Sequence, residues 1–228
     1  MRICSELWAK SQNTKKEKII KNLLTSYTKH SNLKSSEEGA IMKEKLVLAK
    51  GVTFESEPHK YYINGKELSG ITKLIAKRMN IRMPEEFAGE ARNEGLHIHS
   101  AVEQWLDGSE FPSIHPGAVW IKGILERQWH KPQEQCHSEV LVSDLKQFAS
   151  SVDIVGVYPD GTVVLYDIKR SFKRVYVSWQ LSIYQYFIEK YTKYRVAGLN
   201  CLSVKDRTMF PIFAHSKHDV EELLYGSK

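Results

Sequence analysis

Two apolar segments, residues 151–158 and 162–169, flank the turn sequence Pro159-Asp160-Gly161. Both segments are rich in residues that favour strands, and Pro, Asp and Gly favour a tight reversal of the chain. The pattern therefore predicts a β-hairpin with largely buried strands. Buried strands rarely carry charge, yet Asp153 lies on the first segment and Asp167 and Lys169 lie on the second. The fold must therefore bury this hairpin and still provide interaction partners for its three charged side chains.

Periodicity places further elements around the hairpin. Helices are expected at residues 70–78, 84–108, 117–129 and 176–191 and from residue 217, and strands at 53–62, 66–69, 139–142, 196–204 and 209–213. The turn Asn64-Gly65 separates the first two strands, as in a hairpin. The order strand, strand, strand, helix, strand in the second half predicts an α/β fold with a mixed central sheet flanked by helices.

Charge is distributed unevenly along the chain. Residues 1–50 contain 11 basic and 5 acidic side chains, which leaves 22 of each kind for residues 51–228. Residues 15–30 show the apolar stripe of a basic amphipathic helix, and Met42 could serve as an internal start. We expect a basic helical N-terminal extension at 1–50, whose charge favours capture of a polyanion, and one folded domain at 51–228.

Composition excludes several classes of protein. No stretch reaches the roughly 18 to 20 apolar residues of a membrane-spanning helix, and no apolar run near the N-terminus resembles a secretion signal. The expected location is the cytoplasm, without a membrane partner. Cys4, Cys136 and Cys201 are too few and too far apart to indicate a disulfide framework or a zinc or iron–sulfur site.

The chemistry of the chain centres on the charged groups of the hairpin. Asp167 and Lys169 are two residues apart on one strand, so their side chains share a face, and Asp153 lies on the paired strand. Two carboxylates and an ammonium group therefore converge. Four of the six residues at 169–174 are basic, which indicates either a polyanion partner or a solvated surface. An ion pair at the end of a strand is the alternative for Asp167 and Lys169.

A helical histidine adds a ligand of another kind. His99 and Glu103 are spaced i and i+4, so they share one helix face, whereas His97 lies on another face. Carboxylates favour Mg²⁺ or Mn²⁺, and an imidazole is well suited to Mn²⁺. The expected cofactor is therefore Mg²⁺ or Mn²⁺, and a hydrogen-bonded helix histidine is the alternative.

These residues form an ordered series that resembles the motifs of RecB-type nucleases of the PD-(D/E)XK superfamily. Phage exonucleases and the mitochondrial genome-maintenance exonuclease group are similar. The series consists of His99 with Glu103, Glu139, Asp153, Asp167 with Lys169, and Gln180 with Tyr184. The segment at 54–72 resembles one that precedes the catalytic core in such enzymes. Two positions depart from the usual pattern, Leu96 in place of Thr and Ser150 in place of Gly, and neither is a ligand.

The resemblance implies a restriction-endonuclease-like core and a role for each motif residue. His99, Asp153, Asp167 and the backbone carbonyl of Ile168 would bind the metal, and Lys169 would orient or activate the attacking water. Glu139 would be a further ligand or a supporting group, and Glu103 would support the ligands from behind. The DNA strand would be contacted by Gln180, Tyr184, Arg170, Lys173 and Arg174, although helix packing explains Tyr184 equally well.

The function expected from the resemblance is hydrolysis of DNA phosphodiesters by a metal-dependent nuclease. An exonuclease in phage or bacterial recombination, repair or DNA processing is the first interpretation, with a recombination or single-strand-binding protein as a candidate partner. A restriction-like or nicking endonuclease is the alternative within this class. A non-catalytic DNA-binding module is the alternative from another class, and paired carboxylates facing a polyanion speak against it. The sequence indicates neither the oligomeric state nor the polarity of digestion.

Overall fold

The structure is a computed structural model that describes residues 46–57, 59–80 and 88–226. Most of the expected extension at 1–50, with its amphipathic helix, and the start of the helix expected at 84–108 lie outside the described residues. Residues 43–228 form one compact unit. Leu48 and Ala49 are buried among residues of this unit, so its core includes residues that precede position 51.

Most of the elements expected from the sequence are present close to their expected bounds. The helices are α2 (Ile71–Arg78), α3 (Ala88–Leu106), α4 (Pro116–Gln128), α5 (Pro132–Gln135), α6 (Arg174–Tyr191) and α7 (Lys217–Tyr225). The strands are β1 (Val52–Glu55), β2 (Lys60–Ile63), β3 (Lys66–Gly70), β4 (Cys136–Ser143), β5 (Phe148–Val157), β6 (Thr162–Lys169), β7 (Arg195–Ser203) and β8 (Thr208–Pro211). No helix among the described residues is both long and apolar enough to span a bilayer.

The strands form one mixed sheet in the order β1-β2-β3-β5-β6-β7-β8, with β4 paired to β5. β6 and β7 are parallel, as are β3 and β5, whereas the remaining neighbours are antiparallel. Because β4 follows one edge of β5, the strands β3 and β6 must share its other edge. β3 pairs near the start of β5 and β6 pairs near its end, so the middle of that edge has no strand partner among the described residues.

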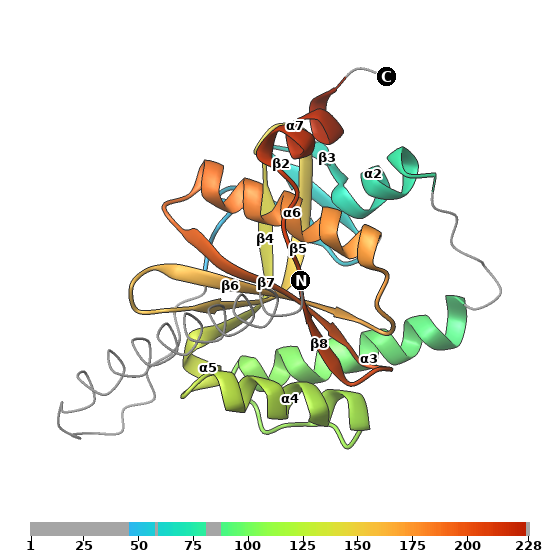
Figure 1. Ribbon diagram of the computed structural model, residues 1–228, viewed down its shortest axis with the longest axis vertical. Coiled ribbons are helices and arrows are strands. Elements are labelled where there is room, and N and C mark those ends of the chain that lie inside the picture. Colours follow the sequence, from blue (N-terminus) through green and yellow to red (C-terminus); the bar gives the residue numbers. More distant parts are fainter. Residues whose placement is uncertain (1–45, 58, 81–87, 227–228) are drawn as a thin grey trace, which may run out of the picture. The chain divides into compact units, whose positions relative to one another are not determined.

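Helices cover both faces of the sheet (Figure 1). On one face α2, α6 and α7 contribute to a core cluster that includes Leu181 and Phe187. On the other face α3 and α4 pack through Ile98, Leu125 and their neighbours. The expected α/β architecture, a mixed central sheet flanked by helices, is confirmed.

The two predicted hairpin turns are present. Gly161 has a φ of 78°, and the β5–β6 ladder on either side pairs Val157 with Val163. Asn64 and Gly65 have φ values of 50° and 77°, the left-handed conformation that a two-residue hairpin turn requires. The single strand expected at 53–62 is wrong, because the chain reverses between β1 and β2 and places them side by side.

The alternation of side chains between the two faces of the sheet is interrupted within β5. Val152 packs in the cluster under α6, whereas Ile154, two residues further on, packs in the cluster under α3 and α4. In a regular strand these two side chains would share a face. The change occurs at Asp153, beside the stretch of β5 whose second edge is unpaired in the described part of the chain.

Candidate metal centre

Two carboxylates face each other across β4 and β5. The pairs Ser138↔Ile154 and Val140↔Val152 flank them, so Glu139 lies opposite Asp153. Like charges directly opposite each other destabilise a sheet. Glu139 also has a φ of 47°, a conformation that costs free energy for any residue with a side chain. Repulsion and backbone strain at one position are typical of a functional site rather than of a structural strand.

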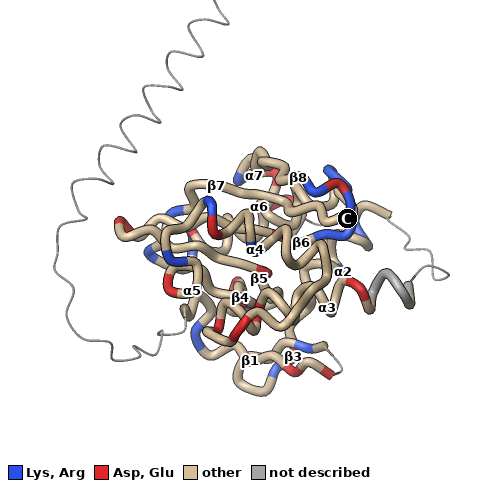
Figure 2. The backbone as a smooth tube through the Cα atoms, turned by 90° about the horizontal axis from the view of Figure 1, so that it is seen from below, with Lys and Arg blue, Asp and Glu red and all other residues tan. Residues whose placement is uncertain are grey.

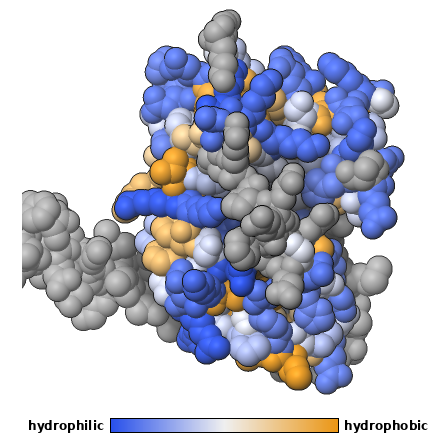
Figure 3. Space-filling view, turned by 90° about the vertical axis from the view of Figure 1, so that its right-hand side faces the viewer, coloured by the Kyte–Doolittle hydropathy of each residue, from blue (hydrophilic) through white to orange (hydrophobic). Residues whose placement is uncertain are grey.

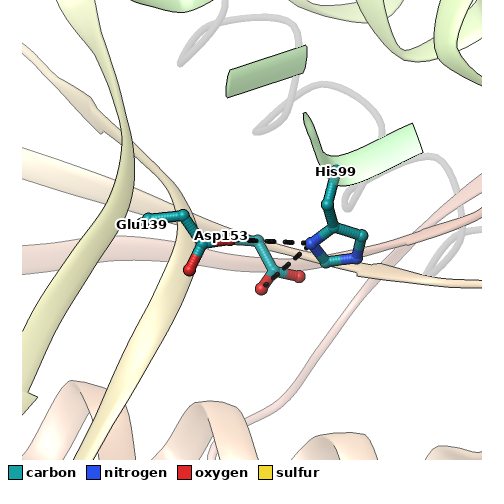
Figure 4. A group of neighbouring side chains, drawn as sticks. All are labelled: His99, Glu139 and Asp153. Carbon is teal, nitrogen blue, oxygen red and sulfur yellow. Dashed lines mark ion pairs between the residues drawn. The ribbon is translucent and has the colours of Figure 1, made fainter. Parts of the chain in front are cut away.

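His99 of α3 points at both carboxylates (Figure 4). Its Nδ1 atom lies 3.7 Å from Oε1 of Glu139 and 3.8 Å from Oδ1 of Asp153. One ligand atom from each residue lies within 4.8 Å of the other two. The His99 side chain is 29% exposed and that of Asp153 is 12% exposed, so the group is open to solvent on one side.

Asp153 is fixed by the backbone of the neighbouring strand. Regular pairing of β5 with β6 ends at Ile154↔Tyr166. Beyond that point the N–H of Ile168 donates to Oδ2 of Asp153 at 2.5 Å, in place of a ladder hydrogen bond. One oxygen of Asp153 is thus held by the sheet while the other faces His99.

Asp167 and Lys169 form the second half of the site. Nζ of Lys169 donates to Oδ1 of Asp167 at 2.7 Å, which confirms that they share a face of β6. Asp167 has no exposed surface, and its Oδ2 atom has no hydrogen-bond partner among the described residues. An unpartnered buried carboxylate oxygen is costly, and a cation is the group that would satisfy it.

The residues present therefore fit a divalent metal ion. An imidazole nitrogen, two facing carboxylates and the unpartnered oxygen of Asp167 are donors that Mg²⁺ and Mn²⁺ accept. The compact group of candidate ligands is His99, Glu139 and Asp153, and Asp167 lies outside that group of three. The carbonyl of Ile168 lies 3.5 Å from Nζ of Lys169, and its role as a ligand stays a prediction.

The charges of the site act strongly on one another. Burial lowers the pKa of His99, but the charge of Asp153 and a hydrogen bond to Glu139 outweigh it and raise the pKa to about 9. Burial raises the pKa of Asp153 above its usual value. Burial opposes protonation of Lys169 too, yet Asp167 and Asp153 raise its pKa, so its ammonium group stays charged.

Two residues expected to contact DNA are buried instead. Tyr184 has no exposed surface, and its hydroxyl bonds to Oγ of Ser150 at 2.9 Å and accepts from Nε2 of Gln180 at 2.7 Å. Gln180 is 4% exposed. The expectation that these two contact DNA is therefore corrected, because their spacing on α6 reflects packing against the sheet. Their position next to Asp167 makes them a support for the site, and the charge of Asp167 raises the pKa of Tyr184 beyond the effect of burial.

The expected basic residues are exposed at the end of β6. Arg170, Lys173 and Arg174 are all exposed, and Figure 2 shows basic segments beside β6 and β8. Nε of Arg170 pairs with Glu94 of α3 at 3.0 Å. Glu103 is half-buried on α3 and is not one of the three clustered ligands.

Sequence reasoning missed two groups that act on the acidic pair or respond to its charge, Ser151 and Tyr61. Oγ of Ser151 donates to Oε2 of Glu139 at 2.5 Å and orients that carboxylate. Burial raises the pKa of Tyr61 to about 12, and the charges of Glu139 and Asp153 contribute, so this β2 residue lies beside the site. Ser151 could have been found, because it lies two residues before Asp153 on the same strand face. Tyr61 could not, because only the β3–β5 pairing brings it there.

No family model, curated protein or solved structure matches this chain. A functional proposal for the chain must therefore rest on the geometry and chemistry of the site.

Proposed function

We propose that the chain is a divalent-metal-dependent DNA nuclease with a core of the PD-(D/E)XK type. One observation carries the proposal. The facing carboxylates of Glu139, whose backbone is strained, and Asp153 lie with His99 beside a buried Asp167 oxygen that has no partner among the described residues and a lysine that remains charged. A structural ion pair would account for Lys169 and Asp167, but not for two carboxylates held face to face.

Each residue has a role in phosphodiester hydrolysis. His99, Glu139, Asp153 and Asp167 would hold Mg²⁺ or Mn²⁺, with the Ile168 carbonyl as a further candidate. Such an ion, when bound, supplies positive charge beside a phosphodiester and makes a water molecule more acidic. Lys169 provides a second fixed positive charge, which stabilises the negative charge that develops on the phosphate and orients the attacking water.

Surrounding contacts keep these groups in place. The Ile168 N–H and the Ser151 hydroxyl orient Asp153 and Glu139. Arg170, Lys173 and Arg174 offer positive charge to the DNA backbone next to the site. The proposed reaction is the removal of nucleotides from DNA ends in recombination, repair or processing, and a recombination or single-strand-binding protein is a partner suited to that role.

Cleavage of end-labelled DNA tests the proposal. Linear single- and double-stranded DNA, labelled at the 5′ or 3′ end, and circular DNA are incubated with Mg²⁺, Mn²⁺ or EDTA. We expect metal-dependent release of label from linear DNA, and a loss of about 100-fold or more in Glu139→Gln. Glu126→Gln, an exposed residue of α4, is the matched control and should cut normally.

The possible results separate the interpretations. Digestion of circular DNA would replace the exonuclease by an endonuclease. Binding of DNA without cleavage in either metal would favour a non-catalytic module. Cleavage that persists in EDTA would contradict the metal-dependent mechanism.

A further inference from the structure

A pocket of about 270 Å³ lies between the β2–β3 hairpin and α2. We call it the hairpin pocket. Its walls combine apolar and polar groups, namely Tyr61, Leu68, Ser69, Thr72, Lys73 and Lys77, with His59 and the Lys60–Glu67 pair at its border. A pocket of this size accepts one small group and is too small for a duplex.

Strand β5 and helix α2 connect the hairpin pocket with the metal centre. Phe148 lines the pocket and begins β5, the strand that carries Asp153. Tyr61 lines the pocket too, and the charges of Glu139 and Asp153 raise its pKa beyond the effect of burial. Thr72 lines the pocket from α2, which packs against α6.

The pocket has unbalanced positive charge. Lys73 and Lys77 are exposed, lie one turn apart on α2, and form no ion pair with any described residue. Like charges at i and i+4 destabilise a helix, and an anion between them removes that cost. The first turn of α2 contains no acidic residue, and its N-cap is Gly70, which has no side chain that could accept a hydrogen bond from the first backbone N–H groups. The two lysines and this helix N-terminus both attract a phosphate. The surrounding side of the molecule, which carries α2 and α3, is largely hydrophilic (Figure 3).

Two aromatic residues, His59 and Tyr61, line the same pocket, and the ring of Phe54 packs against both of them. The centroids of Phe54 and His59 are 4.9 Å apart, as are those of Phe54 and Tyr61, so three rings form one cluster. Phe54 is 37% exposed and His59 is also exposed, so their rings are accessible to a planar ligand. Nucleic-acid bases stack on such rings, and a base is free to do so only when it is unpaired.

We propose that the hairpin pocket binds one unpaired nucleotide of the substrate strand, with its phosphate on Lys73 and Lys77 and its base against His59 and Phe54. This inference rests on the proposed nuclease function and deepens it. It assigns a single strand, or the frayed end of a duplex, as the substrate form that reaches the metal centre.

Binding measured in EDTA tests the pocket without any contribution from the metal. The probe is fluorescein-labelled oligothymidylate, titrated with the full chain at several KCl concentrations. Lys73→Ala/Lys77→Ala should weaken binding about tenfold or more and reduce the slope of log affinity against log salt by about 0.7 for each phosphate that the variant no longer neutralises. His59→Ala should lower affinity by roughly 5- to 100-fold and leave the slope unchanged.

Lys193→Ala/Arg195→Ala is the matched control, because it removes the same charge from two exposed residues just after the far end of α6. That helix has 18 residues and is therefore about 27 Å long, and Tyr176 near its start marks the metal centre. The control should bind like the unchanged chain. Melting temperatures check that every variant is folded.

Three results would overturn the inference. They are an unchanged salt slope in Lys73→Ala/Lys77→Ala, an equal loss of affinity in the control, and equal affinity of the chain for a blunt duplex and for the single strand. If the wild-type chain still cuts DNA, any of these results contradicts only the proposed nucleotide pocket. If it neither binds nor cuts DNA with any metal, the proposed function fails as well.

Discussion

The proton on His99 links folding to metal binding. In the metal-free protein the pKa of His99 is raised from 6.5 to about 9, because Asp153 and Glu139 outweigh the effect of burial. A metal ligand must be a neutral imidazole, so a metal ion has to displace this proton. Metal affinity should therefore rise as the pH increases from 6.5 to 9.

The free energy of unfolding of the metal-free protein should instead decrease as the pH rises. A raised pKa stabilises the folded state fully below pH 6.5, and this contribution is lost as the pH rises through about 9. The loss is at most about 3 kcal/mol. We expect the melting temperature in EDTA to fall between pH 6.5 and 9, and to fall less in His99→Asn, which has no imidazole to titrate. Parallel melting profiles of the two proteins would contradict this prediction.

At the residue scale, spacing along the sequence predicted part of the site. Asp167 and Lys169 share a strand face because they are two residues apart, and the structure confirms their contact. The position of Glu139 opposite Asp153 depends on the register of β4 with β5, which the sequence does not determine. The spacing of Gln180 and Tyr184 fits both DNA contact and packing, and only burial distinguishes the two.

At the scale of elements, β5 depends on one close contact with the segment after α4. An added Cβ at Gly156 would lie 2.1 Å from the ring of Trp129. Trp129 is buried, and its Nε1 donates to the hydroxyl of Tyr166 at 3.0 Å, so the ring cannot easily move away. Gly156 thus allows the helical layer to approach the strand that carries Asp153.

Gly156→Ala should therefore destabilise the protein by about 1–3 kcal/mol, the usual cost of overpacking. For a chain of this size each kcal/mol lowers the melting temperature by about 2–4 °C. Gly198→Ala on β7 is the control, because its new methyl group would meet atoms no closer than 3.6 Å and should change stability little. Thermal unfolding of both variants decides the matter, and an unchanged melting temperature in Gly156→Ala would refute the packing argument.

Sequence patterns predict the bounds of some strands and turns but not of others. The β5–β6 hairpin follows from turn chemistry and from two largely apolar segments, and β6 has the predicted bounds of 162–169. The reversal between β1 and β2 did have a signal in the sequence, because Pro58 interrupts the strand expected at 53–62 and proline cannot donate to a strand ladder. The position of this turn is not specified by a pair such as Asn-Gly, as it is between β2 and β3.

At the scale of the whole molecule, the order of elements predicted the α/β class, but not which strands meet at the site. The centre forms where β3 and β6 leave the middle of one β5 edge open and α3 brings His99 to that opening. These are contacts between parts of the chain that are far apart in sequence. Tertiary packing decides them, and for that reason the position of Glu139 opposite Asp153 and the hairpin pocket emerged only from the structure.

We propose that Lys169 acts on the reaction and does not merely hold Asp167 in the fold. Single-turnover DNA cleavage and the melting temperature, measured on one preparation of Lys169→Ala, distinguish these two roles. We expect a folded protein that binds metal and DNA but cleaves roughly 100-fold or more slowly, because one preorganised charge is removed. Lys169→Arg should restore little, since a planar guanidinium does not replace a compact ammonium group. Lys193→Ala, far from the site, should cut normally. Near-normal cleavage by folded Lys169→Ala, with only a lower melting temperature, would contradict the account.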